Sequence, residues 1–266
     1  MAPIRTLEQL VENVKGTAPR RLAVAAGHDE TVIDERDEYQ AGVRARDMVR
    51  DGEADVLMKG LIGTDKYMHL ILDKERGLLP KGAVLTHITV LDVPAYQATH
   101  GKLLLVSDVA IIPAPDLATK VKIVTYAVDA AHSFGIEIPR VALLAASEKV
   151  SEKMPATVDA AIIAKMAERG QIKGAIVDGP LALDVALSPE ACEIKGLRSV
   201  VEGDADVLIF PNIETGNVFY KSATILGGAR LAAVVVGSSA PCILTSRADS
   251  EESKFFSIAL GCRLAR

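Results

Sequence analysis

Residues 243–261 read ILTSRADSEESKFFSIALG and join an apolar run to a segment with helical spacing. The run from Pro241 to Leu244 has the length and composition of a short buried strand. The segment after it predicts an amphipathic helix, with Asp249 as its N-cap and Glu252 completing a capping box. The helix prediction rests on four apolar residues at i, i+3, i+4 and i+7, namely Phe255, Ile258, Ala259 and Cys262.

Ser246 and Arg247 fall in the loop between this strand and this helix. Parallel α/β sheets bind ligands at such loops, because the backbone N–H groups and the positive dipole end of the helix favour an anion. A guanidinium grips phosphate bidentately and stays charged, so the loop predicts an anion site. The alternative is that Arg247 pairs with a nearby acid on a solvated face and Ser246 is a turn residue.

Composition narrows the class of protein. The chain has 266 residues, of which 49% are hydrophobic, which suffices for one large domain or two smaller ones. A formal net charge of −5 argues against nucleic acid and anionic membranes as partners. Three widely spaced cysteines form neither a disulfide framework nor a metal site. Without a signal peptide or a long apolar run, we expect a cytoplasmic protein that binds no membrane and no metal.

Short β-branched runs alternate with helical segments along most of the chain, which predicts an α/β fold with mostly parallel sheets. Nine runs have strand character, more than a typical sheet holds: 22–26, 54–58, 84–90, 103–112, 141–145, 174–177, 207–210, 232–236 and 242–245. Seven segments have helical character: 5–15, 40–51, 64–75, 116–134, 155–169, 218–230 and 250–264.

Several further motifs accompany the Ser246 loop in a fixed order. They are MKG at 58–60, SDVAIIPAPD at 107–116, DGPLALD at 178–184 and PNIETGNVFYK at 211–221. Together they resemble the phosphate acyltransferases, that is, the phosphate acetyl- and butyryltransferases. TSRADS at 245–250 is similar to the butyryltransferase branch.

The resemblance implies a two-domain, three-layer α/β/α subunit with the active site in the cleft between the domains. The second domain, residues 83–236, would be inserted into a first domain made of residues 1–82 and 237–266. The implied reaction is acyl-CoA plus phosphate giving acyl phosphate plus coenzyme A, with no metal and no redox cofactor. The resemblance also implies a homodimer or larger homo-oligomer, and it favours butyryl or a similar short chain over acetyl.

The resemblance assigns the catalytic residues to the opening stretch. Ser246 and Arg247 match active-site positions, with the serine stabilising the oxyanion or phosphate and the arginine clamping phosphate. The acetyl-transferring branch carries an aspartate seven residues after the serine, but this chain has Ser253 there. Asp249 is either the base for the coenzyme A thiol or the helix cap, so the identity of the base is open.

Four candidate substrate-binding residues lie in the inserted domain. Gly216 and Asn217 can provide a tight turn with donors beside a ligand, and Lys221 offers a cation. The alternative is that this motif is scaffold, with Lys221 solvated. Asp178 ends a predicted strand at the cleft edge, or it caps the next turn.

Two more candidates lie in the first domain. Thr64 either caps the helix after the MKG motif or contacts phosphate. His69 matches the position where related enzymes carry an arginine for coenzyme A, or it is an ordinary helix residue.

The sequence departs from the family near its N-terminus. Residues 22–30 look like the first strand and loop, yet 41–51 already resemble the helix before the MKG strand, where family members usually carry a further βα portion. Either the first domain has lost part or a segment is missing from the sequence. The competing hypotheses are phosphate acetyltransferase and a non-catalytic protein that binds acyl-CoA or phosphate. A minor hypothesis is a dehydrogenase of the isocitrate type, which only Asp204 and Asp206 support.

Overall fold

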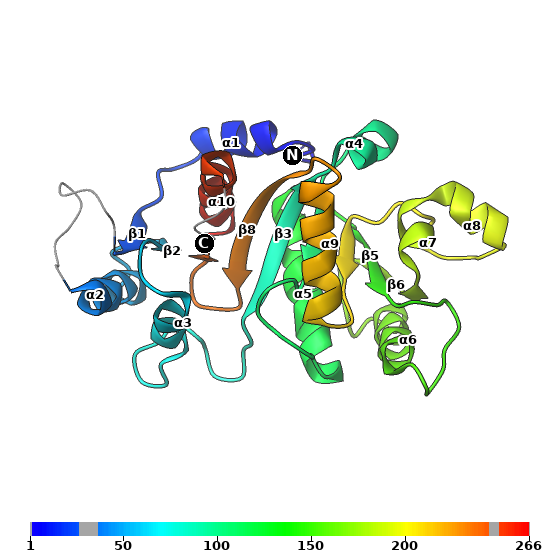
Figure 1. Cartoon of the computed structure of the whole chain (residues 1–266), viewed down its shortest axis with the longest axis horizontal. Helices are drawn as coiled ribbons and strands as arrows, with labels where there is room; N and C mark the ends of the chain where they lie inside the picture. Colours follow the sequence, from blue (N-terminus) through cyan, green and yellow to red (C-terminus); the bar gives the residue numbers. More distant parts are fainter. Residues whose placement is uncertain (1, 27–36, 245–249, 266) are drawn as a thin grey trace. The chain divides into compact units, whose positions relative to one another are not determined.

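The computed structural model describes residues 2–26, 37–244 and 250–265 and divides the chain into two compact units. Unit 1 comprises residues 1–7 and 86–231, and unit 2 comprises residues 8–85 and 232–266. Figure 1 labels the helices of both units and most of their strands. The expected domain boundaries, at 82/83 and 236/237, stay a prediction.

Unit 1 contains a five-stranded sheet in the order β3-β4-β7-β5-β6. β3 runs antiparallel to β4, whereas β4, β7, β5 and β6 run parallel to one another. The strands are β3 (Thr86–Asp92), β4 (Leu104–Ser107), β5 (Arg140–Leu144), β6 (Ile176–Leu181) and β7 (Val207–Ile209). The helices are α4 (Pro94–His100), α5 (Leu117–Ser133), α6 (Pro155–Glu168), α7 (Leu183–Leu187), α8 (Pro189–Lys195) and α9 (Ile213–Ile225).

The central strands of unit 1 are mostly apolar because helices cover both faces of the sheet. Val106 and Leu208 lie in a core cluster against which Phe219 of α9 packs. The alternate residues of these strands point to the other face, and α5 contacts both β4 and β7 there. Unit 1 is therefore a three-layer α/β arrangement (Figure 1).

Unit 2 orders its strands β1-β2-β9-β8. β1, β2 and β9 are parallel, and β8 pairs antiparallel with β9. The strands are β1 (Leu22–Ala25), β2 (Val56–Lys59), β8 (Arg230–Val236), whose first two residues belong to unit 1, and β9 (Cys242–Ile243). The helices are α1 (Leu7–Lys15), whose first residue belongs to unit 1, α2 (Glu38–Arg50), α3 (Thr64–Leu72) and α10 (Glu251–Leu264).

The two faces of β2 are covered by different helices. Val56 and Met58 cluster with Ile258 of α10. Tyr67 of α3 donates its hydroxyl proton to the carbonyl of Leu57. Unit 2 is therefore also layered, with helices on both faces of a mostly parallel sheet.

The structure confirms an α/β fold with mostly parallel strands and all nine strand segments, but it corrects several local predictions. The strand expected at 103–112 ends at Ser107. The helix expected at 218–230 is α9, which begins five residues earlier. The sequence pattern missed the short helices α4, α7 and α8. None of the described helices is long and apolar enough to cross a membrane.

The start of α10 also differs from the prediction. Its N-cap is Ser250, whose Oγ accepts a hydrogen bond from Ser253 N at 3.1 Å, whereas the expected N-cap, Asp249, lies outside the described residues. Phe255 is half exposed, and the buried face instead carries Phe256 and Leu260.

Candidate functional site

The turn after β2 is fixed by close backbone contacts. Gly60 N and Leu61 N donate to the carbonyls of Ala25 and Ala26 at 2.9 and 2.8 Å. A Cβ at Gly60 would lie 2.4 Å from Ala26 O, so only glycine fits at this position. The turn brings the end of β1 against the loop that leads from β2 into α3.

Lys59, the last residue of β2, is a buried cation at this turn. Its side chain lies on the face of the sheet that α3 covers, and the residue is 5% exposed. Its Nζ lies 3.3 Å from Gly60 O. A buried ammonium requires hydrogen bonds, and this one places positive charge at the carboxyl end of β2.

Thr64 is the first residue of α3 and is exposed. The predicted cap is wrong, because the N-cap residue is Gly63 and no side chain caps the helix. Gly63 N instead donates to Glu38 Oε1 at 2.9 Å. The Thr64 hydroxyl thus plays no part in capping, and its contact with phosphate stays a prediction.

His69 lies on the exposed side of α3, near the C-terminal end of the helix. Backbone hydrogen bonds from Arg76 and Glu75 lower the pKa of Asp73, and the charges of Arg46 and His69 add to this effect. His69 is thus near an acid, and its role toward coenzyme A stays a prediction.

The chain leaves β9 at the same sheet edge as it leaves β2. The two strands are parallel, with Met58 paired to Ile243, so Leu244 follows β9 where Lys59 ends β2. Ser246, Arg247 and Asp249 follow Leu244 in the sequence and lie outside the described residues.

In unit 1, the loop after β4 is organised by the buried carboxylate of Asp108. Oδ2 accepts from Thr86 Oγ1 at 2.7 Å and from His87 N at 3.0 Å. Oδ1 accepts from Ala110 N and Ile111 N at 2.7 and 2.8 Å. Four donors satisfy the buried charge, so Asp108 fixes the conformation of the loop rather than remaining available to a ligand.

Gly216 and Asn217 fasten α9 to this loop. They lie inside the helix and form no tight turn, so that prediction is wrong. A Cβ at Gly216 would lie 2.3 Å from Asp108 O, and Asn217 Nδ2 donates to Val109 O at 3.0 Å. The Asn217 amide therefore serves the scaffold at this contact. Their role toward substrate stays a prediction.

Lys221 is exposed on α9, one helical turn beyond Asn217. It makes no ion pair with any part of the chain that the structure describes. The ammonium is open to a ligand or to solvent, so the two interpretations of this residue remain.

Asp178 does not end a strand as predicted, because β6 continues to Leu181. Its carboxylate accepts from Gly179 N at 2.8 Å and from Ser199 Oγ at 2.6 Å. β6 is the outermost strand of this sheet, with β5 between it and β7. Asp178 is therefore not brought together with Gly216 and Asn217, and a substrate contact from it stays a prediction.

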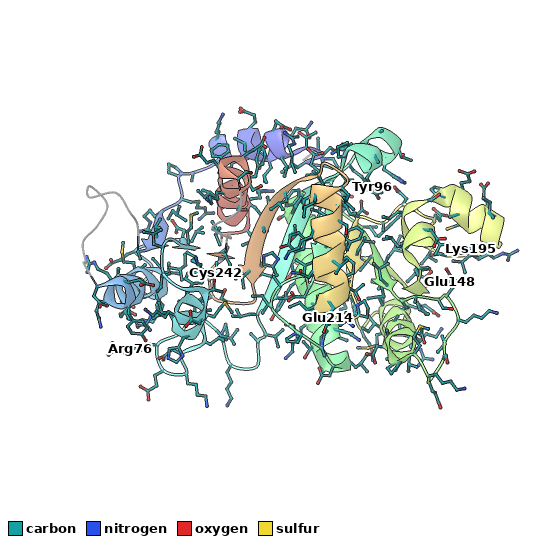
Figure 2. All side chains as sticks on the ribbon, in the orientation of Figure 1. Arg76, Tyr96, Glu148, Lys195, Glu214 and Cys242 are labelled. Atoms are coloured by element: carbon teal, nitrogen blue, oxygen red, sulfur yellow. The ribbon has the colours of Figure 1, made fainter. Side chains whose placement is uncertain are left out.

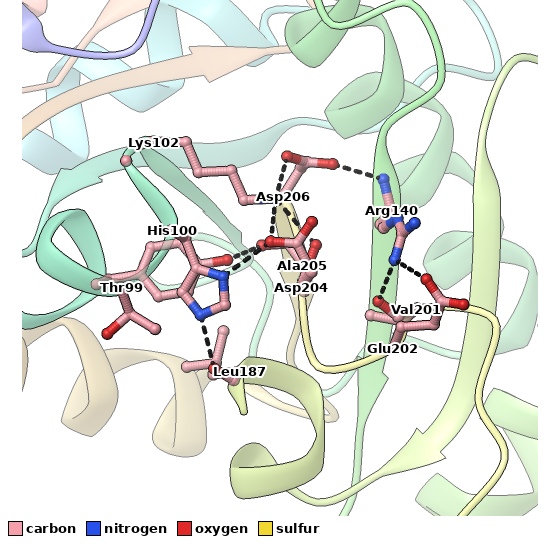
Figure 3. Close-up of polar contacts among 12 residues, drawn as sticks. Thr99, His100, Lys102, Arg140, Leu187, Val201, Glu202, Asp204, Ala205 and Asp206 are labelled. Carbon is pink, nitrogen blue, oxygen red and sulfur yellow. Dashed lines mark hydrogen bonds and ion pairs between the residues drawn. The ribbon is translucent and has the colours of Figure 1, made fainter. Parts of the chain in front are cut away.

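A second polar cluster, of which the sequence analysis singled out only Asp204 and Asp206, lies at the amino ends of β4, β5 and β7 (Figure 3). Lys102 Nζ pairs with Asp204 and Asp206 at 2.9 and 2.8 Å. His100 Nδ1 lies 2.8 Å from Asp204 Oδ1, and Asp206 Oδ2 accepts from Arg140 N at 2.8 Å. Asp204 and Asp206, the acids of the dehydrogenase hypothesis, are thus paired with cations of this cluster.

Burial raises the pKa of Tyr96, which stacks on His100, and the charges of Asp204 and Asp206 raise it further. Burial also acts to raise the pKa of Asp204, but hydrogen bonds and charges from Lys102 and His100 outweigh it and hold that pKa below its usual value. Within unit 1 the cluster lies at the opposite strand ends from Asp108 and the loop after β4. The sequence features that could have indicated this cluster are the acids directly before β7 and the lysine before β4.

Comparisons with known proteins agree with these motifs. A family model described as "Phosphate acetyl/butaryl transferase" matches residues 30–262. The phosphate butyryltransferase of Clostridium acetobutylicum is 44% identical over 238 residues, covering 90% of this chain and 77% of the relative. The phosphate acetyltransferase of Thermotoga maritima is 39% identical over 298 residues, covering 97% of this chain and 99% of the relative.

A solved structure, a branched-chain phosphotransacylase from Enterococcus faecalis V583, matches with a TM-score of 0.82 and 34% identity. The match covers 97% of this chain and 94% of that one. The alignment with the Thermotoga protein spans 298 positions, more than the 266 residues of this chain, so that relative has residues without a counterpart here.

Proposed function

The chain belongs to the phosphate acetyl/butyryltransferase family, and on that premise we propose that it moves a short acyl group between coenzyme A and inorganic phosphate. The observation that carries the proposal is the extent of the family match. It runs through residues 30–262 and so includes Ser246 and Arg247 together with the strand and helix that flank them.

In the direction from acyl-CoA, a phosphate oxygen attacks the thioester carbonyl, the C–S bond breaks, and coenzyme A leaves as a thiolate that takes up a proton. Phosphate is already anionic at neutral pH, so this direction needs a clamp rather than a base for the nucleophile. We assign the clamp to Arg247, since a guanidinium binds two phosphate oxygens at once. We assign Thr64, the first residue of α3, to the same anion, because the dipole of a helix favours an anion at its N-terminus.

Ser246 is assigned to the oxyanion of the tetrahedral intermediate. A preorganised donor of this kind lowers the barrier by about 2–4 kcal/mol. The leaving thiol has an ordinary pKa of about 8.5, so nearby positive charge can stabilise the thiolate at neutral pH. Asp249 is the candidate base for the reverse reaction. Gly216, Asn217 and Lys221 are assigned to substrate binding together with Asp178 and His69.

For the acyl group we propose butyryl or a similar short chain, branched or straight. Two observations support this choice. A relative of 44% identity is a phosphate butyryltransferase, and a solved structure of 34% identity is a branched-chain phosphotransacylase. Acetyl is the alternative, because the Thermotoga relative is a phosphate acetyltransferase.

The test is release of free coenzyme A thiol, followed with a thiol reagent, from acetyl-, propionyl-, butyryl- and branched short-chain acyl-CoA with and without phosphate. We expect turnover that requires phosphate and peaks at four carbons. Arg247→Ala should lower kcat/KM on the order of 10²-fold or more, and Arg247→Lys should raise the phosphate KM. Folded wild-type protein without phosphate-dependent release would contradict the proposal.

We further propose that the protein works in the cytoplasm as a homodimer or larger homo-oligomer, without metal. The support is the family resemblance and the acidic composition. Light scattering of the purified chain, with turnover measured before and after treatment with a chelator, tests the assembly and the absence of a metal. A monomer at micromolar concentration would contradict the proposed homo-oligomer.

A further inference from the structure

Tyr67 of α3 is a fully buried tyrosine whose hydroxyl reaches two neighbouring strands. The hydroxyl oxygen lies 3.0 Å from Leu57 O in β2 and 3.3 Å from Ile243 O in β9. A hydroxyl has one proton, so the two carbonyls share it as acceptors. One side chain therefore links the helix to the last residue of β9.

β9 depends on this link because it is very short. It consists of Cys242 and Ile243, which pair with Leu57 and Met58 of β2, and only Cys242 pairs with β8. In a longer strand, many backbone hydrogen bonds to the neighbouring strands fix its position. Here the hydrogen bond to Ile243 O is one of few that fix the chain just before it leaves the sheet.

The same side chain also holds the helix that begins with Thr64. Tyr67 lies three residues after Thr64, and its backbone N donates to Gly63 O at 2.9 Å in the first turn of α3. α3, the middle of β2 and the end of β9 thus meet at one hydroxyl. These are the three segments of unit 2 that lead to or carry Thr64, Lys59 and Ser246.

The surroundings keep this hydroxyl protonated at neutral pH. Burial raises the pKa of Tyr67 well above its ordinary value, and the neighbouring Cys242 raises it further. Burial also raises the pKa of the Cys242 thiol, to about 11, with the polar contacts to Ser238 and Tyr67 opposing the shift. Figure 2 labels Cys242 on β9. The proton that the two carbonyls share is therefore present throughout the working pH range.

We propose that Tyr67 is a positioning residue for acyl transfer: its hydroxyl fixes the end of β9, from which the chain leads to Ser246 and Arg247, against the helix that carries Thr64. The inference rests on the proposed function for its catalytic consequence. Its structural part, that the hydroxyl immobilises the end of β9, can be measured without turnover.

The test is Tyr67→Phe, with Tyr96→Phe as the matched control. Tyr96 is also a buried tyrosine whose hydroxyl donates to a backbone carbonyl, that of Ala205, but it stacks on His100 of the second polar cluster (Figure 2). Each variant removes one buried hydroxyl, so both should lower the thermal midpoint to a similar extent. A role limited to stability would leave kcat of both unchanged at a temperature where both are folded.

We expect kcat of Tyr67→Phe to fall roughly tenfold to a hundredfold, since a misplacement of about 1 Å costs that much, while the KM for acyl-CoA changes less than about twofold. The Tyr96→Phe variant should keep kcat within about twofold. Equal kcat values in the two variants would overturn the proposal and leave the proposed function untouched.

The second measurement is amide hydrogen exchange in the peptide covering residues 238–250. Exchange at Ile243 and Leu244 should accelerate by about tenfold or more in Tyr67→Phe and stay at the wild-type rate in Tyr96→Phe. Unchanged exchange in Tyr67→Phe would overturn the proposal even if turnover fell. If the wild type has no turnover, the proposed function fails, and the exchange result alone decides whether the hydroxyl fixes β9.

Discussion

At the scale of one residue, Gly216 shows how closely α9 packs against the loop after β4. A Cβ there would lie 2.3 Å from Asp108 O and 3.2 Å from its carbonyl carbon, and backbone cannot yield as a flexible side chain can. We expect Gly216→Ala to lower the free energy of unfolding by about 1–3 kcal/mol, as overpacked sites do. Urea unfolding measures the change.

Gly16→Ala is the control for this substitution. Its Cβ would lie 3.5 Å from Asn13 O, an ordinary contact, so the variant should change the free energy of unfolding by less than about 0.5 kcal/mol. Equal stabilities of the two variants would show that α9 can move away from Asp108 without cost, contrary to the packing described.

The sequence pattern could not show why this glycine is needed. Glycine followed by asparagine is typical of turns, which led to the prediction of a tight turn with free donors. The partner of Asn217 is Val109, 108 residues earlier in the chain, and spacing within a motif carries no information about such a contact. The place of Ser246 and Arg247 between a strand and a helix predicted an anion site, but their catalytic roles came from motif resemblance alone.

At the scale of elements, buried apolar runs predicted the strands well because parallel strands covered on both faces must be apolar. The helices were harder. Asn212 caps α9 by accepting from Thr215 N at 3.0 Å, a signal that lies six residues before the predicted start of the helix. α4, α7 and α8 have seven, five and seven residues, too few turns to show a periodic apolar face.

The second polar cluster supports a prediction about the elements that it joins. The pKa of Asp204 is lowered in the folded protein, so its carboxylate stabilises the fold above the unfolded pKa of about 3.9, and this contribution is lost as pH falls through the lower folded value. Asp204→Asn should therefore reduce stability at pH 7 by about 1 kcal/mol or less, since the side chain is 39% exposed.

The measurement is the thermal midpoint of wild type and Asp204→Asn from pH 7 down to pH 3. The difference between them should be largest at neutral pH and shrink below about pH 4. Glu137→Gln, at an exposed loop position, is the control and should track the wild type throughout. A difference that grows as the pH falls would mean that the charged form of Asp204 is not the stabilising one.

At the scale of the whole molecule, alternating strands and helices predicted the fold class but not the order of the strands. In unit 1 the chain enters β4, skips a position to β5, moves outward to β6 and returns to β7 between β4 and β5. Such an order follows from packing between elements far apart in the sequence. Only the resemblance to a family predicted a particular architecture.

The last prediction concerns ligand linkage in the whole chain. A ligand that binds only the folded state stabilises it by RT ln(1 + [L]/Kd), which is about 2.7 kcal/mol at one hundred times Kd. If Arg247 is the phosphate clamp, adding phosphate together with coenzyme A should raise the thermal midpoint of the wild type. Arg247→Ala should lose the part of the rise that depends on phosphate and keep the part due to coenzyme A.

Arg169→Ala supplies the matched control, because Arg169 is an exposed arginine at the C-terminal end of α6, and its removal changes the net charge by the same unit. Its phosphate-dependent rise should equal that of the wild type. Equal losses in the two variants would assign the effect to general charge rather than to a clamp. Because this measurement needs no turnover, a clear rise in the wild type without acyl transfer would favour a binding protein over an enzyme.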